Sequence, residues 1–292
     1  MSKKIALFSK GLTEKTTAAL LRVIDALHTR GVNTYLNIME PSGNRFESDP
    51  RVSVFHEVSE LPGDTSLIIS VGGDGTFLET ARRIHNQDIP VAGINTGRLG
   101  FLANIPDDDI GRSIDLLCAD DYEVVSRTML EIISPENLFG SGNSLALNEV
   151  TVQRADQTMI SIMVKVNGTI LNTYRADGLI ISTATGSTAY NLSVGGPILS
   201  PSDESIIIAP ISPHNLTIRP IITGSGSTVT MVMEGRSDDC FLTCDSRAVR
   251  VPLGTTIEIR QAAFSLRTVT TAGNDFFSTL RNKLMWGADL RN

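Results

Sequence analysis

Apolar residues follow two different spacings along this chain, and the change from one to the other predicts two domains. In the first part, short apolar runs alternate with segments in which apolar residues recur every three or four positions. The runs predict buried strands at 4–8, 32–38, 67–71 and 90–94, and the segments predict helices at 13–30, 76–84 and 107–118. Strands that alternate with helices in this way indicate an α/β layer built on a parallel sheet.

From about Tyr122 onward, the segments become short, rich in β-favouring residues and separated by turn residues. This pattern is typical of an antiparallel sheet domain. The pair Asn167-Gly168 marks the clearest hairpin, because it suits a two-residue turn that needs positive φ. The strands of this domain are expected at 122–133, 145–153, 161–174, 178–182, 227–234, 240–244 and 255–260.

A final helix is expected at Asp275–Met285, where Phe276, Leu280 and Leu284 fall on one face. That face needs an apolar partner, which either the β domain or the α/β layer can supply. The expected fold class is an α/β N-terminal domain with a Rossmann-like parallel sheet plus an all-β antiparallel C-terminal domain. The expected divisions of the chain are 1–124, 125–270 and 271–292.

Charge and cysteine content limit the classes of partner and the compartment. A net charge of −7 argues against nucleic acid or a membrane surface as a partner, because both bind a basic face. No apolar segment approaches the roughly 20 residues that span a bilayer. Cys118, Cys240 and Cys244 lack metal-ligand spacing, and no signal peptide precedes them, so we expect reduced thiols in a cytoplasmic protein.

The stretch Leu67–Phe77 organises the first domain, because its apolar strand enters a glycine turn that carries one carboxylate, Asp74. Glycines let the main chain pass close to a ligand, and the free N–H groups at a helix start attract phosphate. A turn that only bound phosphate would gain nothing from a negative side chain, so we expect Asp74 to meet a hydroxyl proton or a metal ion. The alternative is a tight strand-to-helix connection in which Asp74 caps the helix.

A second polar stretch, Arg175–Ser193, lies in the middle of the β domain. Its strand, Gly178–Ser182, runs into several hydroxyl residues and a glycine, which suit ribose, amide or phosphate groups. Asp177 precedes this strand and is either a ligand or a turn residue. The pair Asn148 and Glu149 interrupts an apolar strand, and it is either a buried pair that needs polar partners or an edge-facing pair.

Three motifs together resemble the bacterial NAD kinase family: Gly72-Gly-Asp-Gly75, Asn148-Glu149, and Asp177-Gly-Leu-Ile-Ile-Ser-Thr-Ala-Thr-Gly-Ser-Thr-Ala-Tyr190. They occur in the family's order and at its spacing, and Asn95–Leu102 and Gly195–Pro197 extend the similarity over nearly the whole chain. The first motif alone also resembles diacylglycerol kinases, sphingosine kinases and phosphofructokinases, so the third carries most of the specificity. The resemblance implies a last helix that returns to the N-terminal domain.

The resemblance also implies a reaction, in which the terminal phosphate of ATP passes to the 2′-hydroxyl of the adenosine ribose of NAD to make NADP. Asp74 would accept the hydroxyl proton, and Mg²⁺ or another divalent cation would accompany ATP, with no residue assigned as a metal ligand. The residues expected to bind the nucleotides are Gly72, Gly73, Asp74, Gly75, Phe77, Asn148, Glu149, Arg175, Asp177, Thr185, Thr188, Ala189, Tyr190, Asn191, Leu192, Ser193 and Arg247. The family further implies a homodimer or homotetramer whose subunits share the site.

Three positions depart from the family pattern. Ala184 stands where many members have proline, Thr158 falls near a position where some have histidine, and Arg247 occupies a position that is often glutamine. These departures concern the preference for oxidised or reduced substrate and the inhibition by product, not the chemistry. Because the chain lacks a G-x-x-x-x-G-K-[ST] loop, the candidate cations for the triphosphate are Arg98 and Arg175.

Two other functions are alternatives. A lipid kinase of the diacylglycerol type would use the same glycine turn, but it would need an apolar or basic membrane-facing surface, and neither the charge nor an amphipathic stretch indicates one. A non-catalytic sensor of NAD or NADP would be favoured by loss of the turn carboxylate, and Asp74 is present.

Overall fold

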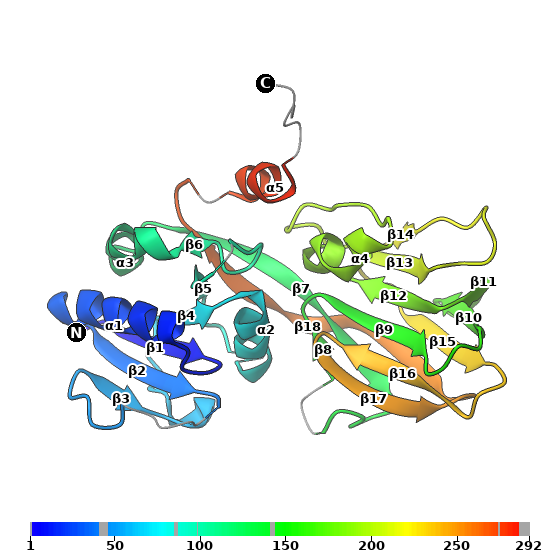
Figure 1. Cartoon of the computed structure of the whole chain (residues 1–292), viewed down its shortest axis with the longest axis horizontal. Helices are drawn as coiled ribbons and strands as arrows, with labels where there is room; N and C mark the ends of the chain where they lie inside the picture. The colour runs from blue at the N-terminus through cyan, green and yellow to red at the C-terminus, as the bar shows by residue number, and fades with distance from the viewer. Residues whose placement is uncertain are drawn as a thin grey trace. The chain divides into compact units, whose positions relative to one another are not determined.

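The computed structural model describes residues 2–40, 46–84, 87–97, 99–140, 144–273 and 275–285, and Figure 1 follows the chain from its first helix, α1, to its last, α5. The chain divides into two compact units. The first unit comprises residues 1–125 together with 266–292, and the second comprises residues 126–265. The second unit therefore interrupts the sequence of the first.

The first unit is built on a parallel sheet. Its strands are β1 (Lys4–Ser9), β2 (Asn33–Ile38), β3 (Val52–Val54), β4 (Leu67–Gly72), β5 (Val91–Asn95) and the short β6 (Ile105–Pro106). They follow the order β3-β2-β1-β4-β5, with β6 also beside β5, and every pair is parallel. The end of β18 (Thr256–Thr270) joins this sheet, because Thr268 pairs in parallel with Val91. The α/β prediction for the N-terminal part is confirmed.

Helices cover both faces of this sheet. They are α1 (Glu14–Thr29), α2 (Asp74–Arg83) and α3 (Ile110–Cys118), which a 3₁₀ turn at Asp107–Asp109 precedes. Successive strand residues point to opposite faces. On one face, Ile5, Leu7 and Ile69 share an apolar cluster with α1 and α3. On the other face, Thr80 of α2 donates a hydrogen bond to the Ser70 hydroxyl of β4 at 3.2 Å, so α2 packs there.

The last helix, α5 (Phe276–Leu284), belongs to the first unit. Asp275 caps it by accepting hydrogen bonds from the main-chain N–H groups of Phe277 and Ser278. Leu280 is buried, but Leu284 is 38% exposed, so the prediction that Phe276, Leu280 and Leu284 form one buried face is wrong at its C-terminal end. A single buried turn suffices to dock so short a helix. None of the helices described in the structure is long and apolar enough to cross a membrane.

The second unit consists of two antiparallel sheets. One contains β10 (Ile160–Val166), β11 (Thr169–Ala176), β15 (Val229–Glu234) and the first part of β18, with β7 (Glu123–Ser134) and β8 (Leu145–Ala146) alongside. The other follows the order β14 (Ile221–Thr223), β13 (Ile206–Ile211), β12 (Gly178–Ser182), β9 (Glu149–Arg154), β16 (Asp239–Cys244) and β17 (Arg247–Pro252). The all-β antiparallel prediction is confirmed.

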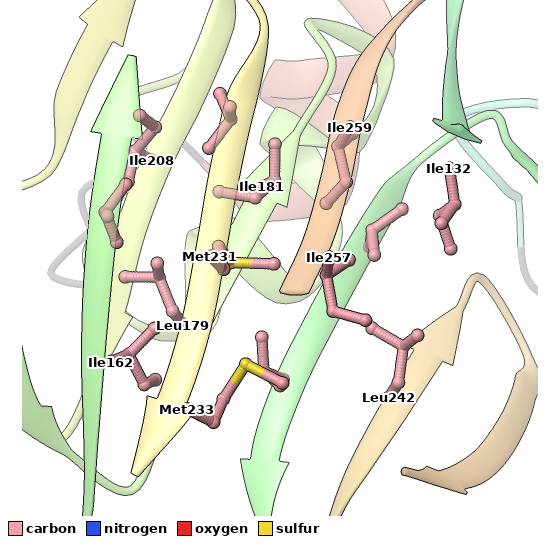
Figure 2. Close-up of a cluster of buried hydrophobic side chains, with 14 of the residues drawn as sticks. Ile132, Ile162, Leu179, Ile181, Ile208, Met231, Met233, Leu242, Ile257 and Ile259 are labelled. Carbon is pink, nitrogen blue, oxygen red and sulfur yellow. The ribbon is translucent and has the colours of Figure 1, made fainter. Parts of the chain in front are cut away.

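Apolar side chains from both sheets form the core of the second unit (Figure 2). Ile162, Met231 and Ile257 reach in from one sheet, and Leu179 and Leu242 from the other, all fully buried. Alternate residues of each strand supply these side chains, as the two-residue period of a strand requires. Each fully buried side chain of this size contributes about 1.5–3 kcal/mol, so this core is the main stabilising term of the unit.

Turn residues were predicted more reliably than short or central strands. Asn167 and Gly168 have φ values of 50° and 79°, so the predicted hairpin is present. The pattern missed β3 and β14, which have only three residues each, and it missed β13 and β17. β13 is buried along its whole length and is an apolar run like those that predicted the strands of the first unit, but it contains Pro210, and a proline inside a run argues against a central strand.

Gly93 of β5 gives the first testable prediction. A Cβ at this position would lie 2.7 Å from Ala103 Cα and 2.9 Å from Leu102 O, both main-chain atoms. We expect Gly93→Ala to lower the free energy of unfolding by about 1–3 kcal/mol, as overpacking in a core does. Urea unfolding measures this change. Gly111→Ala is the matched control, since nothing lies within 4 Å of a Cβ there, and an equal loss in both variants would contradict the prediction.

Candidate functional site

Asp74 lies at the junction of β4 and α2 in the first unit. Gly73 occupies the N-cap position and Asp74 is the first residue of the helix, so the alternative that Asp74 caps the helix is wrong. The first N–H groups of a helix have no partner within it and attract anions. Gly73 and Gly75 are exposed, so this main chain is open to a ligand. Gly72 is needed for packing, because a Cβ there would lie 2.3 Å from the Thr76 hydroxyl.

Main-chain N–H groups from the loop after β5 hold the Asp74 carboxylate. Leu102 and Ala103 donate to Oδ1 at 3.1 and 2.9 Å, and Phe101 donates to Oδ2 at 3.0 Å. Gly100 makes this approach possible, because a Cβ there would lie 1.9 Å from Oδ1. Three charge-assisted bonds fix the orientation of the carboxylate while its side chain stays 32% exposed. The arrangement presents an oriented proton acceptor at the start of α2.

Of two further residues of the first unit, Lys283 lies beside the Asp74 carboxylate, whereas Phe77 is buried in the core. Lys283 of α5 places its Nζ 3.7 Å from Asp74 Oδ2, and the sequence analysis missed it because one lysine on an amphipathic helix carries no motif. Phe77 was expected to bind nucleotide, but it is 1% exposed and its ring faces Gly93 of the sheet. The structure therefore places Phe77 in the core.

In the second unit, strand pairing brings three chain segments together. Glu149 at the start of β9 pairs with Ser182 at the end of β12, and Val150 pairs with Cys244 at the end of β16. Asn148 adds main-chain contacts, because its carbonyl oxygen accepts the Thr183 N–H at 2.9 Å. The Asn148-Glu149 pair, the residues after β12 and the turn after β16 therefore meet at one end of the sheet.

Asp245, in the turn after β16, organises this end of the sheet. Its carboxylate accepts the main-chain N–H groups of Leu147, Asn148 and Glu149 at 2.9, 2.9 and 3.2 Å, and its own N–H donates to the Glu149 carbonyl oxygen at 3.0 Å. The sequence analysis missed Asp245, because an acidic residue between two strands is indistinguishable from an ordinary turn residue. Its position with φ of 50° agrees with such a turn.

The pKa of the Glu149 carboxyl group is raised. Burial raises its pKa to about 8, the negative charge of Asp245 adds to the rise, and the main-chain N–H of Tyr190 opposes it. Glu149 is 9% exposed, and its Oε2 has no hydrogen-bond partner in the part of the chain that the structure describes. Burial also raises the pKa of Asp245, against the three N–H groups and Arg247. At neutral pH Glu149 is thus a neutral acid that can donate a hydrogen bond to a ligand.

The glycine-rich stretch after β12 forms a 3₁₀ turn at Thr185–Thr188 and a short helix, α4 (Tyr190–Ser193). Thr185 is buried and accepts a hydrogen bond from Arg127 at 3.3 Å. Thr188 and Ala189 are half-buried, and the Ala189 N–H donates to Gly186. Leu192 is half-buried and Ser193 is exposed. These residues leave hydroxyl and main-chain groups accessible at the same end of the sheet as Glu149.

Asn191 supports this stretch from inside. It is fully buried, and its Nδ2 donates to the carbonyl oxygens of Ser187 and Pro197 at 3.2 and 3.0 Å. Gly196 packs on it so closely that a Cβ would lie 1.9 Å from its Oδ1. The amide nitrogen of Asn191 is therefore occupied by the protein, whereas its buried Oδ1 has no hydrogen-bond partner among the residues that the structure describes.

Asp177 and Arg175 lie at the other end of β12. Asp177 forms an ion pair with Arg154 at 2.9 Å, so it is more than a turn residue. Tyr190 connects the two ends, because its hydroxyl accepts a hydrogen bond from Gln153, which pairs with Gly178. Arg175 is exposed and lines an open hollow with Asn172, Thr173, His214, Asn215, Leu216 and Ile218. Arg98 lies outside the described residues.

The Arg247 side chain is engaged in contacts within the protein. Its guanidinium donates to the Leu145 carbonyl oxygen at 2.6 Å and to Cys244 Sγ at 3.2 Å, and it lies 5.4 Å from the centre of the Phe139 ring. Among the other departures from the family pattern, Ala184 is buried, and Thr158 bonds to Asp156 and Ser237.

The described residues include no group of three or more His, Cys, Asp or Glu side chains that could hold a metal ion. Mg²⁺ usually binds proteins through one or two carboxylates together with substrate phosphates and water. The single partly exposed carboxylate of Asp74, at a helix start suited to phosphate, fits a cation that arrives with a nucleotide.

Family models and curated relatives match this chain over most of its length. Two family models match, the ATP-NAD kinase N-terminal domain over residues 12–122 and the ATP-NAD kinase C-terminal domain over residues 147–271. An NAD kinase of Cytophaga hutchinsonii is 43% identical over 231 residues, 79% of each chain. An NAD kinase of Flavobacterium psychrophilum is 35% identical over 294 residues, 99% of this chain and 100% of that one.

Two solved structures share the fold. Yeast NADH kinase complexed with NADH matches with a TM-score of 0.81 and 24% identity, over 99% of this chain and 89% of that one. An NAD kinase from Archaeoglobus fulgidus in complex with ATP matches with a TM-score of 0.75 and 24% identity, over 95% of this chain and 98% of that one.

The raised pKa of Glu149 predicts a pH-dependent stability. Between pH 4.5 and about 8 the folded chain keeps the Glu149 proton and the unfolded chain loses it, so the free energy of unfolding falls as pH rises. We expect Glu149→Gln to remove this slope, a difference on the order of 3 kcal/mol between pH 5 and 8. Urea unfolding at five pH values measures it. Glu204→Gln, at an exposed site, should keep the wild-type slope, and parallel curves for wild type and Glu149→Gln would contradict the prediction.

Proposed function

We propose that this chain, which belongs to the NAD kinase family, transfers the terminal phosphate of ATP to the 2′-hydroxyl of the adenosine ribose of NAD and so makes NADP. One observation carries the proposal: the Asp74 carboxylate is held by three main-chain N–H groups at an exposed helix start. Such a group is an oriented base beside an anion site. Relatives that match over 99% of the chain and carry the name NAD kinase support the same reaction.

The reaction needs alignment and charge neutralisation more than covalent chemistry. A bond forms between the 2′-oxygen and the terminal phosphorus, the bond from that phosphorus to the bridging oxygen breaks, and ADP leaves with the electron pair. Asp74 Oδ2, which accepts one N–H where Oδ1 accepts two, takes the hydroxyl proton. Bound with ATP, Mg²⁺ would neutralise phosphate charge beside Asp74 and the first N–H groups of α2.

We assign the dinucleotide to residues of the second unit. Glu149, as a neutral acid, donates a hydrogen bond to the ligand, and Asp245 fixes the main chain that carries it. Thr188 and Ala189 supply hydroxyl and main-chain groups at the same end of the sheet, and Tyr190, whose hydroxyl accepts a hydrogen bond from Gln153, follows them. In functional terms, residues 1–124 bind the triphosphate, residues 125–270 bind the dinucleotide, and residues 271–292 complete the first domain.

The two alternative functions predict different behaviour of the purified protein. A lipid kinase would phosphorylate diacylglycerol in vesicles, and a sensor would bind NAD without turnover. The relatives at 35–43% identity are named as NAD kinases, and the Asp74 carboxylate is present and oriented, which supports the NAD kinase.

The three free cysteines support a reducing cytoplasmic location.

We further propose a homodimer or homotetramer in which subunits share the dinucleotide site. The hollow that Arg175 lines is open, and Leu216 in it is 86% exposed. Ile170 and Ile222, on the edge strands β11 and β14, are 64% and 48% exposed. Large exposed apolar side chains next to a binding residue are typical of an interface between copies of a chain.

Replacement of the proposed base tests the reaction. Because a positioned base contributes about 10²–10⁴-fold, we expect Asp74→Asn to lower kcat by that factor and to leave NAD binding within about threefold. NADP formation from NAD, ATP and Mg²⁺ is followed with an NADP-specific dehydrogenase, and NAD binding by calorimetry. Asp64→Asn is the matched control, since Asp64 pairs with Lys4 on the surface of the same unit. Full turnover in Asp74→Asn would overturn the assignment.

The shared site can be tested through Leu216. We expect Leu216→Asp to shift the chain from a dimer or tetramer toward a monomer and to raise the KM for NAD, because a buried charge opposes the apolar contact. Sedimentation velocity gives the mass and steady-state kinetics the KM. Ser202→Asp places the same charge at an exposed position before β13, whereas Leu216 follows β13. A wild-type monomer, or no change in mass for Leu216→Asp, would count against the interface.

A further inference from the structure

The last helix brings one cation to the Asp74 carboxylate. Lys283 Nζ lies 3.7 Å from Asp74 Oδ2 and 4.6 Å from the centre of the Phe101 ring. Phe101 also donates its N–H to the same Oδ2. Its ring lies 6.4 Å from that of Phe276, on the first turn of α5. The lysine is therefore located by two separate contacts beside one particular oxygen of the proposed base.

The position of Lys283 is not explained by stability. Its side chain is 35% exposed and Asp74 is 32% exposed, and exposed ion pairs of this kind contribute little to folding. The carboxylate is already held by three N–H groups, so it does not need the lysine for its orientation. The ammonium group lies on the Oδ2 side, where the carboxylate has the lower number of N–H partners. This is the side from which a hydroxyl can approach.

We propose that Lys283 is a catalytic residue that supplies positive charge to the phosphoryl group as it moves to the 2′-oxygen, an inference that rests on the function proposed above. A hydroxyl bound to Oδ2 would lie about 2.7 Å from it, within reach of an ammonium group 3.7 Å away on a flexible four-carbon chain. Before substrate binds, Lys283 pairs with Asp74. As the phosphoryl group moves to the 2′-oxygen, the same charge reduces the repulsion between the carboxylate and the phosphate oxygens.

The proposed phosphoryl transfer needs a positive charge beside the moving group, and Lys283 can supply it. Phosphoryl transfer spreads negative charge over the equatorial oxygens of the moving group, and kinases place a lysine or arginine there. This sequence has no G-x-x-x-x-G-K-[ST] loop to supply such a lysine. Lys283 takes no part in the proton transfer, because the proton of the 2′-hydroxyl goes to Asp74 and the leaving electron pair goes to ADP. Its contribution is therefore electrostatic and belongs to the transition state.

Three variants separate this role from a structural one. We expect Lys283→Met to lower kcat about 10²-fold, the usual effect of losing one transition-state partner, with KM values for NAD and ATP within about threefold of wild type. Lys283→Arg should recover most of the loss, because it keeps the charge. Arg281→Met is the matched control on the same helix, where the side chain is exposed, and it should keep wild-type kcat. Thermal unfolding should be the same for all four proteins.

The outcomes are distinct. Absence of NADP formation by the wild type would overturn the proposed function and this inference with it. An active wild type with kcat of Lys283→Met within twofold would overturn only the role of Lys283. Equal loss in Arg281→Met, or a lower unfolding temperature in Lys283→Met alone, would assign the effect to the packing of α5 and overturn the catalytic role. Failure of Lys283→Arg to recover activity would overturn the role of charge.

Discussion

The bonds between the Asp74 carboxylate and the N–H groups of residues 101–103 are the interaction on which the first unit's site depends. They require a helix that begins at Asp74 and a loop that passes close above it. Gly100 and Gly93 make that close passage possible, because neither position has room for a Cβ. The parallel sheet supplies the geometry, since β4 and β5 are neighbours and the loop after β5 emerges beside the start of α2. The order of the strands in the sheet, together with Gly93 and Gly100, thus determines the position of the Asp74 carboxylate.

The second unit contains the same kind of bond, but the bond has a different role there. Asp245 also accepts N–H groups from three consecutive residues, 147–149. There the Asp245 carboxylate holds the main chain of residues 147–149 in place, and that main chain carries Glu149. Because Asp245 lies close to Glu149 in a buried setting, its charge helps to keep Glu149 protonated. A carboxylate bonded to three main-chain N–H groups therefore occurs in both units. In the first unit it fixes Asp74 as a hydrogen-bond acceptor, and in the second it helps to make Glu149 a hydrogen-bond donor.

Sequence patterns predicted the parts of this fold that local chemistry determines. The helix expected at 13–30, the hairpin at Asn167-Gly168 and the strand-turn-helix around Asp74 all follow from nearby residues, and the structure has them. Asp245 and Lys283 could not be found in this way. Their contacts join residues about 100 or 200 positions apart, and neither lies in a distinctive local motif. Phe77 shows a different limit of sequence patterns, because it lies inside the glycine-turn motif and yet its side chain is buried in the core.

The order of the two units along the chain has a consequence for biosynthesis. Lys283 and the end of β18 belong to the first unit, but they follow the entire second unit in sequence. A ribosome that adds about 5–20 residues per second delivers them roughly 7–30 seconds after Val125. During that interval β5 lacks the strand that later pairs at Thr268, and Asp74 lacks its cation. The nascent chain therefore holds an incomplete first unit until α5 has been synthesised, and only then can Lys283 reach Asp74.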